Sequence, residues 1–328
     1  NLFTDDEYAG IAKIYTKSSS TNKYEESDLL FPDTITNTNP DTGAEQNTVG
    51  NHFHFGENSV AIDKYQNGRW TAAVSALDGN QPYVFIYEDS GAGFTLIHTL
   101  SSFSNNSSAA PTVEISRDYL FVGDYTNNTV YVYSINSLKS NNETRKTISW
   151  TNNQGTFGKT IVCKDGATGG PGVSPNLFIA DPTAEVSYQT SGTFTATTGV
   201  VYHYVMEEPE TQEWNLYNTL TPTFESTPNQ IDNSGYGDTS SIWDVDSKFG
   251  LYLDVTTPEN DSLYVAVGSP SWYRDSDSAQ LDNREGAIFV YEVSTAEAES
   301  HALIKSITKS SVASGSVPDN YELGTGVS

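Results

Sequence analysis

The chain repeats one set of four phrases, and this repetition restricts its fold more than any other feature. Residues 249–310 show the set most clearly: "FGLYLDV", then "SLYVAVGSP", then "GAIFVYEV", then "HALIKSITKSS". Each phrase is short, rich in Val, Ile, Tyr, Phe or Thr, and separated from the next by turn-forming residues, which is typical of β-strands. The sequence therefore predicts a unit of four short strands.

Three more copies precede this one. They begin at Phe55 ("FGENSVAID"), at about residue 111 ("PTVEIS") and at Phe157 ("FGKTIVCKD"). No segment has the pattern of an amphipathic helix, and residues 294–300 predict one turn at most. A four-stranded sheet cannot bury both of its faces alone, whereas sheets stacked around an axis cover one another. We therefore predict an all-β fold, a β-propeller of four-stranded antiparallel blades.

The two ends of the chain carry phrases of a fifth unit. "NLFTDDE" at the start resembles the second-strand phrase "NLFIADPTAE", and "AGIAKIYTKS" and "KYEESDLLFPD" resemble the third and fourth strands. "YELGTGVS" at the other end resembles a first strand, with Leu323-Gly324 in place of Phe-Gly. We predict one domain, residues 1–328, with five recognisable blades: 53–103, 109–151, 155–222, 247–311, and a fifth shared between the termini, 1–33 plus 319–328. The alternative is a window of a seven-bladed propeller.

These motifs resemble the FG-GAP family of β-propeller repeats, most closely the type found in exported microbial and marine proteins, and more distantly the heads of integrin α-subunits. The resemblance rests on Phe249-Gly250 with "VAVGSP", Phe157-Gly158 with "FIADP" and Phe55-Gly56 with "SVAID". It covers nearly the whole chain. Many repeats of this family bind Ca²⁺ through an Asp-rich loop between strands one and two. The corresponding segments "TTPEND" and "KDGATGGPGVSP" lack that pattern, so the resemblance assigns no calcium site to any blade.

Charge restricts the partners. The chain has 42 acidic and 16 basic residues, a formal net charge of -26. Binding to nucleic acid needs a basic surface, and an anionic membrane repels an acidic one. No apolar run is long enough to span a bilayer. We therefore expect no nucleic-acid partner and no membrane insertion. The single cysteine, Cys163, excludes an intrachain disulfide and is expected to be a small buried residue.

Asn-x-Ser/Thr sequences mark candidate glycosylation sites, which fit an exported glycoprotein. The acceptors are Asn105, Asn106, Asn127, Asn142 and Asn260.

One polar loop of the last unit, "SWYRDSDSAQLDNRE", holds the other candidate site residues. Asp275, Asp277, Asp282 and Asn283 offer the hard oxygen ligands that Ca²⁺ prefers, so Ca²⁺ is the candidate cofactor. A solvated acidic loop is the alternative interpretation. Trp272 and Tyr273 lie in the same loop and are candidate binding aromatics, because exposed rings stack on sugars and anchor protein partners.

Catalytic motifs are missing from the sequence: it has no G-x-S-x-G, no H-E-x-x-H, no phosphate-binding loop and no Cys/His cluster. We therefore expect an extracellular or cell-surface, secreted, non-enzymatic propeller that acts in adhesion or in a surface structure. Its expected partners are proteins, surface glycans or further copies of itself. The alternative is a carbohydrate-binding or carbohydrate-cleaving propeller, a lectin, glycosidase or lyase.

Overall fold

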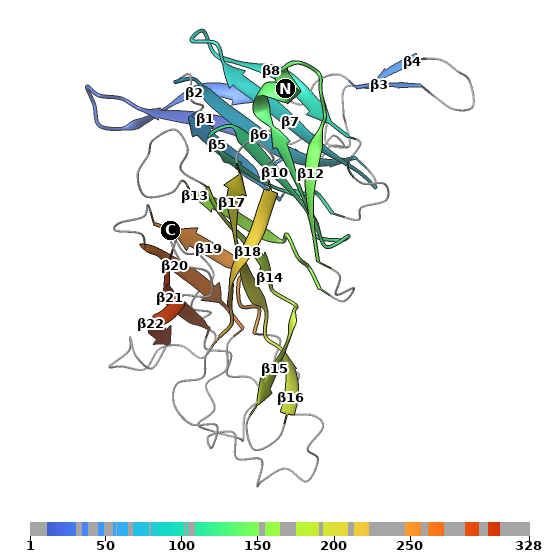
Figure 1. Ribbon diagram of the computed structural model, residues 1–328. Helices are drawn as coiled ribbons and strands as arrows, with labels where there is room; N and C mark the ends of the chain where they lie inside the picture. Colours follow the sequence, from blue (N-terminus) through green and yellow to red (C-terminus); the bar gives the residue numbers. More distant parts are fainter. Residues whose placement is uncertain are drawn as a thin grey trace. The chain divides into compact units, whose positions relative to one another are not determined.

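The computed structural model describes most of the chain (Figure 1). The described residues are 12–30, 35–38, 45–48, 55–56, 58–64, 68–78, 80–101, 103, 109–150, 155–164, 175–189, 193–208, 213–222, 247–256, 262–271, 286–294 and 301–308. The chain divides into two compact units, one of Asn1–Thr126 with Val130–Thr147, the other of Asn127–Thr129 with Ile148–Ser328. The single domain predicted for residues 1–328 stays a prediction.

The first unit holds two four-stranded sheets and two smaller ones. One sheet has the order β5-β6-β7-β8 and the other the order β9-β10-β11-β12, with β1-β2 and β3-β4 as two-stranded sheets. The strands are β1 (Ala12–Lys17), β2 (Tyr24–Leu30), β3 (Ile35–Thr38), β4 (Glu45–Thr48), β5 (Val60–Lys64), β6 (Trp70–Asp78), β7 (Gln81–Asp89), β8 (Phe94–Leu100), β9 (Thr112–Ser116), β10 (Tyr119–Asp124), β11 (Thr129–Ser134) and β12 (Arg145–Ser149). Strand β12 runs on into the second unit.

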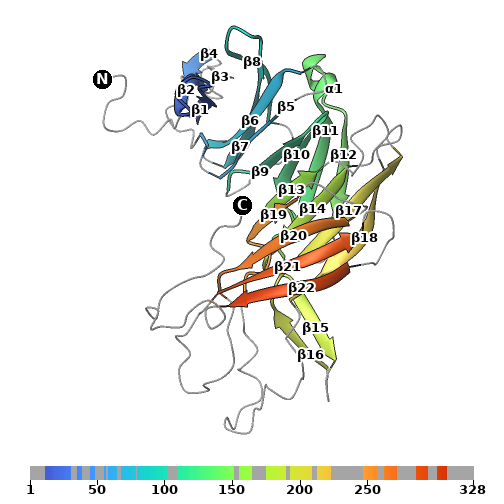
Figure 2. The same cartoon turned by 90° about the vertical axis from the view of Figure 1, so that its left-hand side faces the viewer.

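The second unit repeats the same plan (Figure 2). Its four-stranded sheets have the orders β13-β14-β17-β18 and β19-β20-β21-β22, and β15-β16 forms a separate hairpin. The strands are β13 (Thr160–Lys164), β14 (Asn176–Asp181), β15 (Glu185–Gln189), β16 (Thr193–Thr197), β17 (Val200–Glu208), β18 (Glu213–Leu220), β19 (Tyr252–Val255), β20 (Ser262–Ser269), β21 (Ala287–Ser294) and β22 (His301–Thr308).

The predicted fold class is confirmed at the level of its blades. In each four-stranded sheet, strands that follow one another within the repeat lie side by side, and the registers of β5–β8, β13–β18 and β19–β22 are antiparallel. A four-stranded antiparallel meander is the blade of a β-propeller. The four sheets fall within the predicted ranges 53–103, 109–151, 155–222 and 247–311. We refer to them as blades one to four.

A shared β-bulge identifies β1 and β2 as a third and a fourth strand. The register between strands three and four shifts before a tyrosine in blades one, three and four, and β1-β2 shifts in the same way. The shifts lie at Ile86/Tyr87, His203/Tyr204, Val290/Tyr291 and, in β1, Ile14/Tyr15. Both strands lie within the range 1–33, and the shared fifth blade stays a prediction. The first and second strands predicted for the shared blade, in 319–328 and 1–7, lie outside the described residues.

The Phe-Gly motif lies in a turn before the first strand, whereas the sequence suggested that it begins the strand. Gly56, Gly158 and Gly250 have φ values of 77°, 93° and 91°, which glycine adopts without a steric penalty. Each glycine N–H donates to a carbonyl of strand two: Ser75 at 2.8 Å, Ala180 at 3.0 Å and Gly268 at 3.1 Å, respectively. The motif therefore fixes the start of strand one against strand two, and these bonds also define which residues of the blades are equivalent.

The phenylalanine of the motif fills the core of its own blade. Phe55, Phe157 and Phe249 are buried. Their ring centroids lie 5.4–5.5 Å from an aromatic ring of strand three, at Phe85, Tyr202 and Phe289 respectively. Tilted and edge-on rings at this distance are a favourable aromatic arrangement.

Besides the two-stranded β3-β4 sheet, two elements were not predicted. A short helix, α1 (Ile135–Lys139), follows β11, where the sequence suggested that the strand continues through Ile135. Ile135 and Leu138, one turn apart, are both buried, and Lys139 pairs with Glu88 of β7. The second element is the β15-β16 hairpin between strands two and three of blade three.

Candidate binding surface

The loop that the sequence singled out lies outside the described residues. This applies to Asp275, Asp277, Asp282 and Asn283, the candidate Ca²⁺ ligands, and to Trp272 and Tyr273, the candidate binding aromatics. Within the ranges that the structure describes, no group of three or more His, Cys, Asp or Glu side chains is placed to hold a metal ion. The Ca²⁺ site stays a prediction.

A melting experiment tests that Ca²⁺ site. If the loop binds Ca²⁺ in the folded chain, free Ca²⁺ at a hundred times its dissociation constant raises the free energy of unfolding by about 2.7 kcal/mol. We expect the melting temperature to rise on adding Ca²⁺ at low ionic strength, to fall with a chelator, and to respond to neither in an Asp275→Asn, Asp277→Asn double variant. An unchanged melting temperature in the parent chain excludes a structural Ca²⁺ site.

Two of the five candidate glycosylation sites are described, and both are exposed. Asn127 lies in the turn between β10 and β11, and Asn142 lies between α1 and β12. The Asn142 Oδ1 atom accepts hydrogen bonds from the backbone N–H and the hydroxyl of Thr144, at 3.1 and 2.7 Å. Asn105, Asn106 and Asn260 lie outside the described residues.

The structure offers a different candidate, an exposed apolar face on blade four. Tyr264 of β20 is 42% exposed, Ile304 of β22 is 53% exposed, and Ile288 and Val290 of β21 are partly exposed. The register places Ala266 opposite Val290, and Gly268 opposite Ile288. Directly paired residues point to the same face of a sheet. Ile304 is the extra residue of the bulge in β22, and its counterpart in blade three, Tyr217, contacts the ring of His203. We call the face formed by Tyr264, Ala266, Ile288, Val290 and Ile304 the outer face of blade four.

Equivalent positions are buried in other blades. The register of β6-β7 places Ala73 and Ile86 where blade four has Ala266 and Val290, and that of β14-β17 places Phe178 and His203 there. All four of these blade-one and blade-three residues are fully buried. Tyr264 likewise stands where blade one has the buried Thr71. The outer face of blade four therefore has the composition of an interface between blades and the exposure of a surface.

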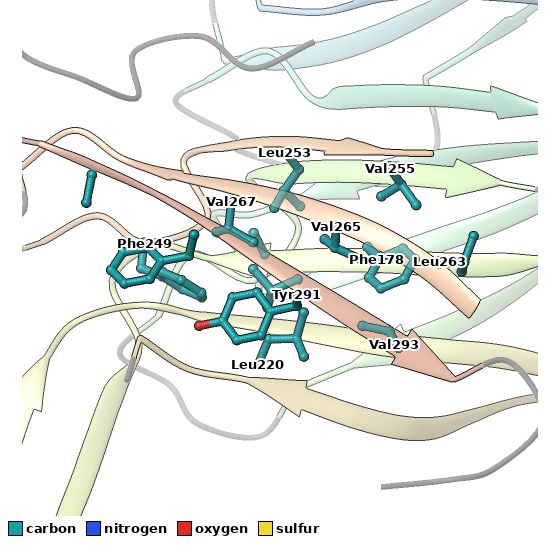
Figure 3. Close-up of a cluster of buried hydrophobic side chains, with 14 residues drawn as sticks. Phe178, Leu220, Phe249, Leu253, Val255, Leu263, Val265, Val267, Tyr291 and Val293 are labelled. Atoms are coloured by element: carbon teal, nitrogen blue, oxygen red, sulfur yellow. The ribbon is translucent and has the colours of Figure 1, made fainter. Parts of the chain in front are cut away.

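The opposite face of blade four is part of the core of the second unit (Figure 3). Leu253, Val265, Val267, Phe289 and Tyr291 are buried in one cluster with residues of blade three. The Tyr291 hydroxyl donates to the Thr221 carbonyl at 2.7 Å. The two faces of the same sheet thus differ sharply in exposure.

A row of polar side chains crosses from blade three to blade four. Nε2 of the buried His203 lies 2.9 Å from Asn176 Oδ1, and its Nδ1 lies 3.1 Å from Asn218 Nδ2. Asn218 Oδ1 lies 3.3 Å from His301 Nδ1 on β22. One neutral tautomer satisfies every member: His203 donates from Nε2 to Asn176 and accepts at Nδ1 from Asn218, and His301 donates from Nδ1 to Asn218.

Burial keeps His203 uncharged. Desolvation, with a smaller contribution from the nearby His301, lowers the pKa of His203 from its ordinary 6.5 to about 3. Burial also lowers the pKa of His301. The His203 ring stacks on Phe178, with centroids 4.5 Å apart. Because it is fully buried and its two nitrogens are both bonded, His203 serves packing and register between strands rather than catalysis.

The sequence held weak signals for these features. The aromatic phrase "GVVYHYV" predicts a strand, but a lone histidine in it does not reveal that two asparagines on neighbouring strands will bond to it. The nearly continuous apolar phrases "SLYVAVGSP" and "GAIFVYEV" predict a sheet with two apolar faces, but not which of the two faces is exposed.

Comparison with known proteins leaves the family open, because no family model matches the chain and no curated protein matches it. Among solved structures, one from Lactobacillus plantarum is 10% identical with a TM-score of 0.36, and the match covers 89% of this chain and 76% of that one. A candidate exported protein from Bacteroides fragilis is 11% identical with a TM-score of 0.27, covering 92% and 78%. Likeness this low bears on neither fold nor function.

Among the described residues, no helix has the length and apolar character needed to cross a membrane.

Proposed function

We propose that the chain is an extracellular or cell-surface, non-enzymatic β-propeller that acts in adhesion or in a surface structure by binding a protein. The observation that carries this proposal is the outer face of blade four. Tyr264 and Ile304 are about half exposed there, beside Ile288 and Val290. Contiguous apolar surface on a folded protein marks an interaction site more often than isolated apolar residues do.

Charge defines the kind of partner. The chain carries a net charge of -26, so an approaching protein is favoured when its contact surface is basic around an apolar centre. Lys305, exposed and paired with Val290, places one positive charge on the same face, against the net negative charge of the whole chain. The proposed partner is therefore a protein with an apolar centre and a basic rim.

One substitution separates this contact from general attraction between opposite charges. Ile304→Asp removes apolar area and adds a negative charge. Beads coated with the chain are presented to surfaces bearing a basic, a neutral or an acidic protein, at low and high salt. We expect Ile304→Asp to reduce binding to the basic protein at least about fivefold.

Leu216→Asp is the matched control, since Leu216 of β18 is 43% exposed and lies on blade three. It adds the same charge and is expected to bind as the parent does. Binding that rises in both variants would show that charge alone drives adhesion, and the proposed surface would then be wrong.

Two further experiments test the lectin alternative and the enzyme alternative. Binding to a glycan array that Trp272→Ala abolishes would favour the lectin alternative. Turnover of a polysaccharide by the purified chain would overturn the non-enzymatic part of the proposal.

A further inference from the structure

Blade one has an exposed apolar patch that blades two, three and four, as far as the structure describes them, do not have at the same place. Val60 and Ile62 of β5 are 50% and 45% exposed, and Trp70 of β6 is 44% exposed. Val60 pairs with Val74, Ile62 with Ala72, and Lys64 with Trp70, so the three side chains share one face of the sheet. We call these three residues the blade-one patch.

The repeat shows what this patch ordinarily does. The register places Leu253, Val255 and Leu263 of blade four where blade one has Val60, Ile62 and Trp70. Those three are 8%, 3% and 0% exposed. The two first-strand positions are buried in the remaining blades as well, as Val113 and Ile115, and as Ile161 and Cys163. In blades two, three and four the two first-strand positions therefore belong to the core.

One side chain of the preceding blade helps to bury the blade-four counterparts. Phe178 of β14 lies in the same buried cluster as Leu253, Val255 and Leu263. Figure 3 shows its ring beside Leu263 and close to Val255. Phe178 is the third residue of "NLFIAD", the second strand of blade three, and it pairs with His203 of the third strand.

The blade that precedes blade one is represented by β1 and β2. Ala12 and Leu30 are buried in one cluster with Ala72 and Phe85 of blade one, and Ile14 packs against it. The Asp28 carboxylate accepts a hydrogen bond from the Phe94 N–H at 2.5 Å. By the shared bulge, Ile14 stands in the place that His203 has in blade three. The position opposite Ile14 on a second strand is therefore the counterpart of Phe178.

The N-terminal segment supplies a matching phrase. Residues 1–6 read "NLFTDD", against "NLFIAD" at 176–181, and the third residue of each is phenylalanine. We propose that residues 1–6 dock as an antiparallel strand along β1, with Phe3 opposite Ile14, and that Phe3 covers the blade-one patch. Only residues 7–11 separate the segment from β1, so the short connection holds the segment at high effective concentration.

Cross-linking tests the docking directly. Phe3→Cys and Ile62→Cys are combined in a Cys163→Val chain, valine being the residue at the equivalent place of blade four, Val255. A short bis-maleimide is expected to join the two thiols within one chain. The matched control is Thr4→Cys with Ile62→Cys, because neighbouring strand residues point to opposite faces. It is expected to cross-link at least about tenfold less.

Other cross-linking results would overturn the proposal. Cross-links between two chains, on a non-reducing gel of a dilute sample, would assign the patch to a second copy and overturn the proposal. Equal cross-linking of Thr4→Cys and Phe3→Cys, or none in either, would also overturn it.

A second measurement tests the proposal without the pair of cysteines at positions 3 and 62, in case that variant does not fold. In the chain with Cys163→Val and Ile62→Cys only, the maleimide labelling rate of the thiol at position 62 is expected to rise about tenfold when Phe3→Asp is added. An unchanged rate shows that Phe3 does not cover the patch.

Discussion

Replacing Gly199 with alanine is expected to lower the free energy of unfolding by about 4 kcal/mol, among the largest effects of a single methyl group. Gly199 has a φ of 87°, a conformation that alanine adopts only with strain. An added Cβ would lie 2.3 Å from the Phe249 carbonyl oxygen and 3.0 Å from that of Pro182. Both obstacles are backbone atoms, so no side-chain rotation relieves the clash.

The surrounding hydrogen bonds explain why the backbone cannot yield. Phe249 N–H donates to the Thr198 carbonyl at 3.0 Å, and the buried Ser247 hydroxyl donates to the same oxygen at 2.6 Å. Gly199 N–H donates to the Ala184 carbonyl at 3.1 Å. The segment before β17 is thus bonded to the Phe-Gly turn of blade four. A displacement large enough to admit the methyl group breaks these bonds where water cannot replace them.

Gly91→Ala is the matched control. Gly91 has nearly the same φ, 84°, but no atom lies within 4 Å of an added Cβ. It isolates the conformational cost, which is expected to be about 1 kcal/mol. Urea unfolding of both variants measures the difference. Equal losses in the two variants would contradict a close approach between blades at Gly199.

Strands were predictable because their signals are local. "NLFIAD" is an apolar run that ends in a small and a turn-forming residue, and β14 occupies those six residues with every one buried. The repeated order of such phrases also predicted the pairing of strands within each blade, since neighbours in a meander need only short connections.

Features that depend on contacts far along the chain could not be predicted in this way. Ile135 continues an alternating strand pattern, yet it begins a helix because the turn allows both Ile135 and Leu138 to be buried. The β15-β16 hairpin had a usable signal, a Thr- and Tyr-rich run on both sides of Ser191-Gly192, in a segment to which no strand was assigned.

The candidate surface depends on neighbours rather than on composition. Val290 and Ile86 occupy equivalent positions with similar side chains, yet Ile86 is fully buried and Val290 is not. No property of either phrase distinguishes them. What differs is the element stacked on the sheet, and sequence alone does not reveal that element.

The second large effect is expected at His203, where substitution with leucine should cost about 3 kcal/mol at pH 7. Val290 and Ile86 show that an aliphatic side chain fits this position in other blades, so the cost does not arise from volume. It arises because Asn176 and Asn218, both buried, lose the imidazole to which they are bonded at 2.9 and 3.1 Å.

Lowering the pH removes part of the stability that His203 contributes to the parent chain. In the folded chain the pKa of His203 is about 3, below its ordinary 6.5, so the unfolded chain takes up a proton at a higher pH than the folded chain does. The contribution of His203 is therefore fully present above pH 6.5 and falls as the pH drops from 6.5 towards 3. Between pH 7 and pH 5 the parent chain is expected to lose about 2 kcal/mol from this residue alone.

His203→Leu removes that dependence. The gap between the parent and the variant is expected to narrow from about 3 kcal/mol at pH 7 to about 1 kcal/mol at pH 5, as measured by urea unfolding at both values. His301→Gln is the control. Its side chain is partly exposed and its pKa is lowered by burial, so it is expected to change the pH dependence in the same direction by less. If the gap between parent and variant stays constant with pH, His203 takes up a proton as readily in the folded chain as in the unfolded chain. The buried row of asparagine and histidine side chains would then not hold the ring in its neutral form.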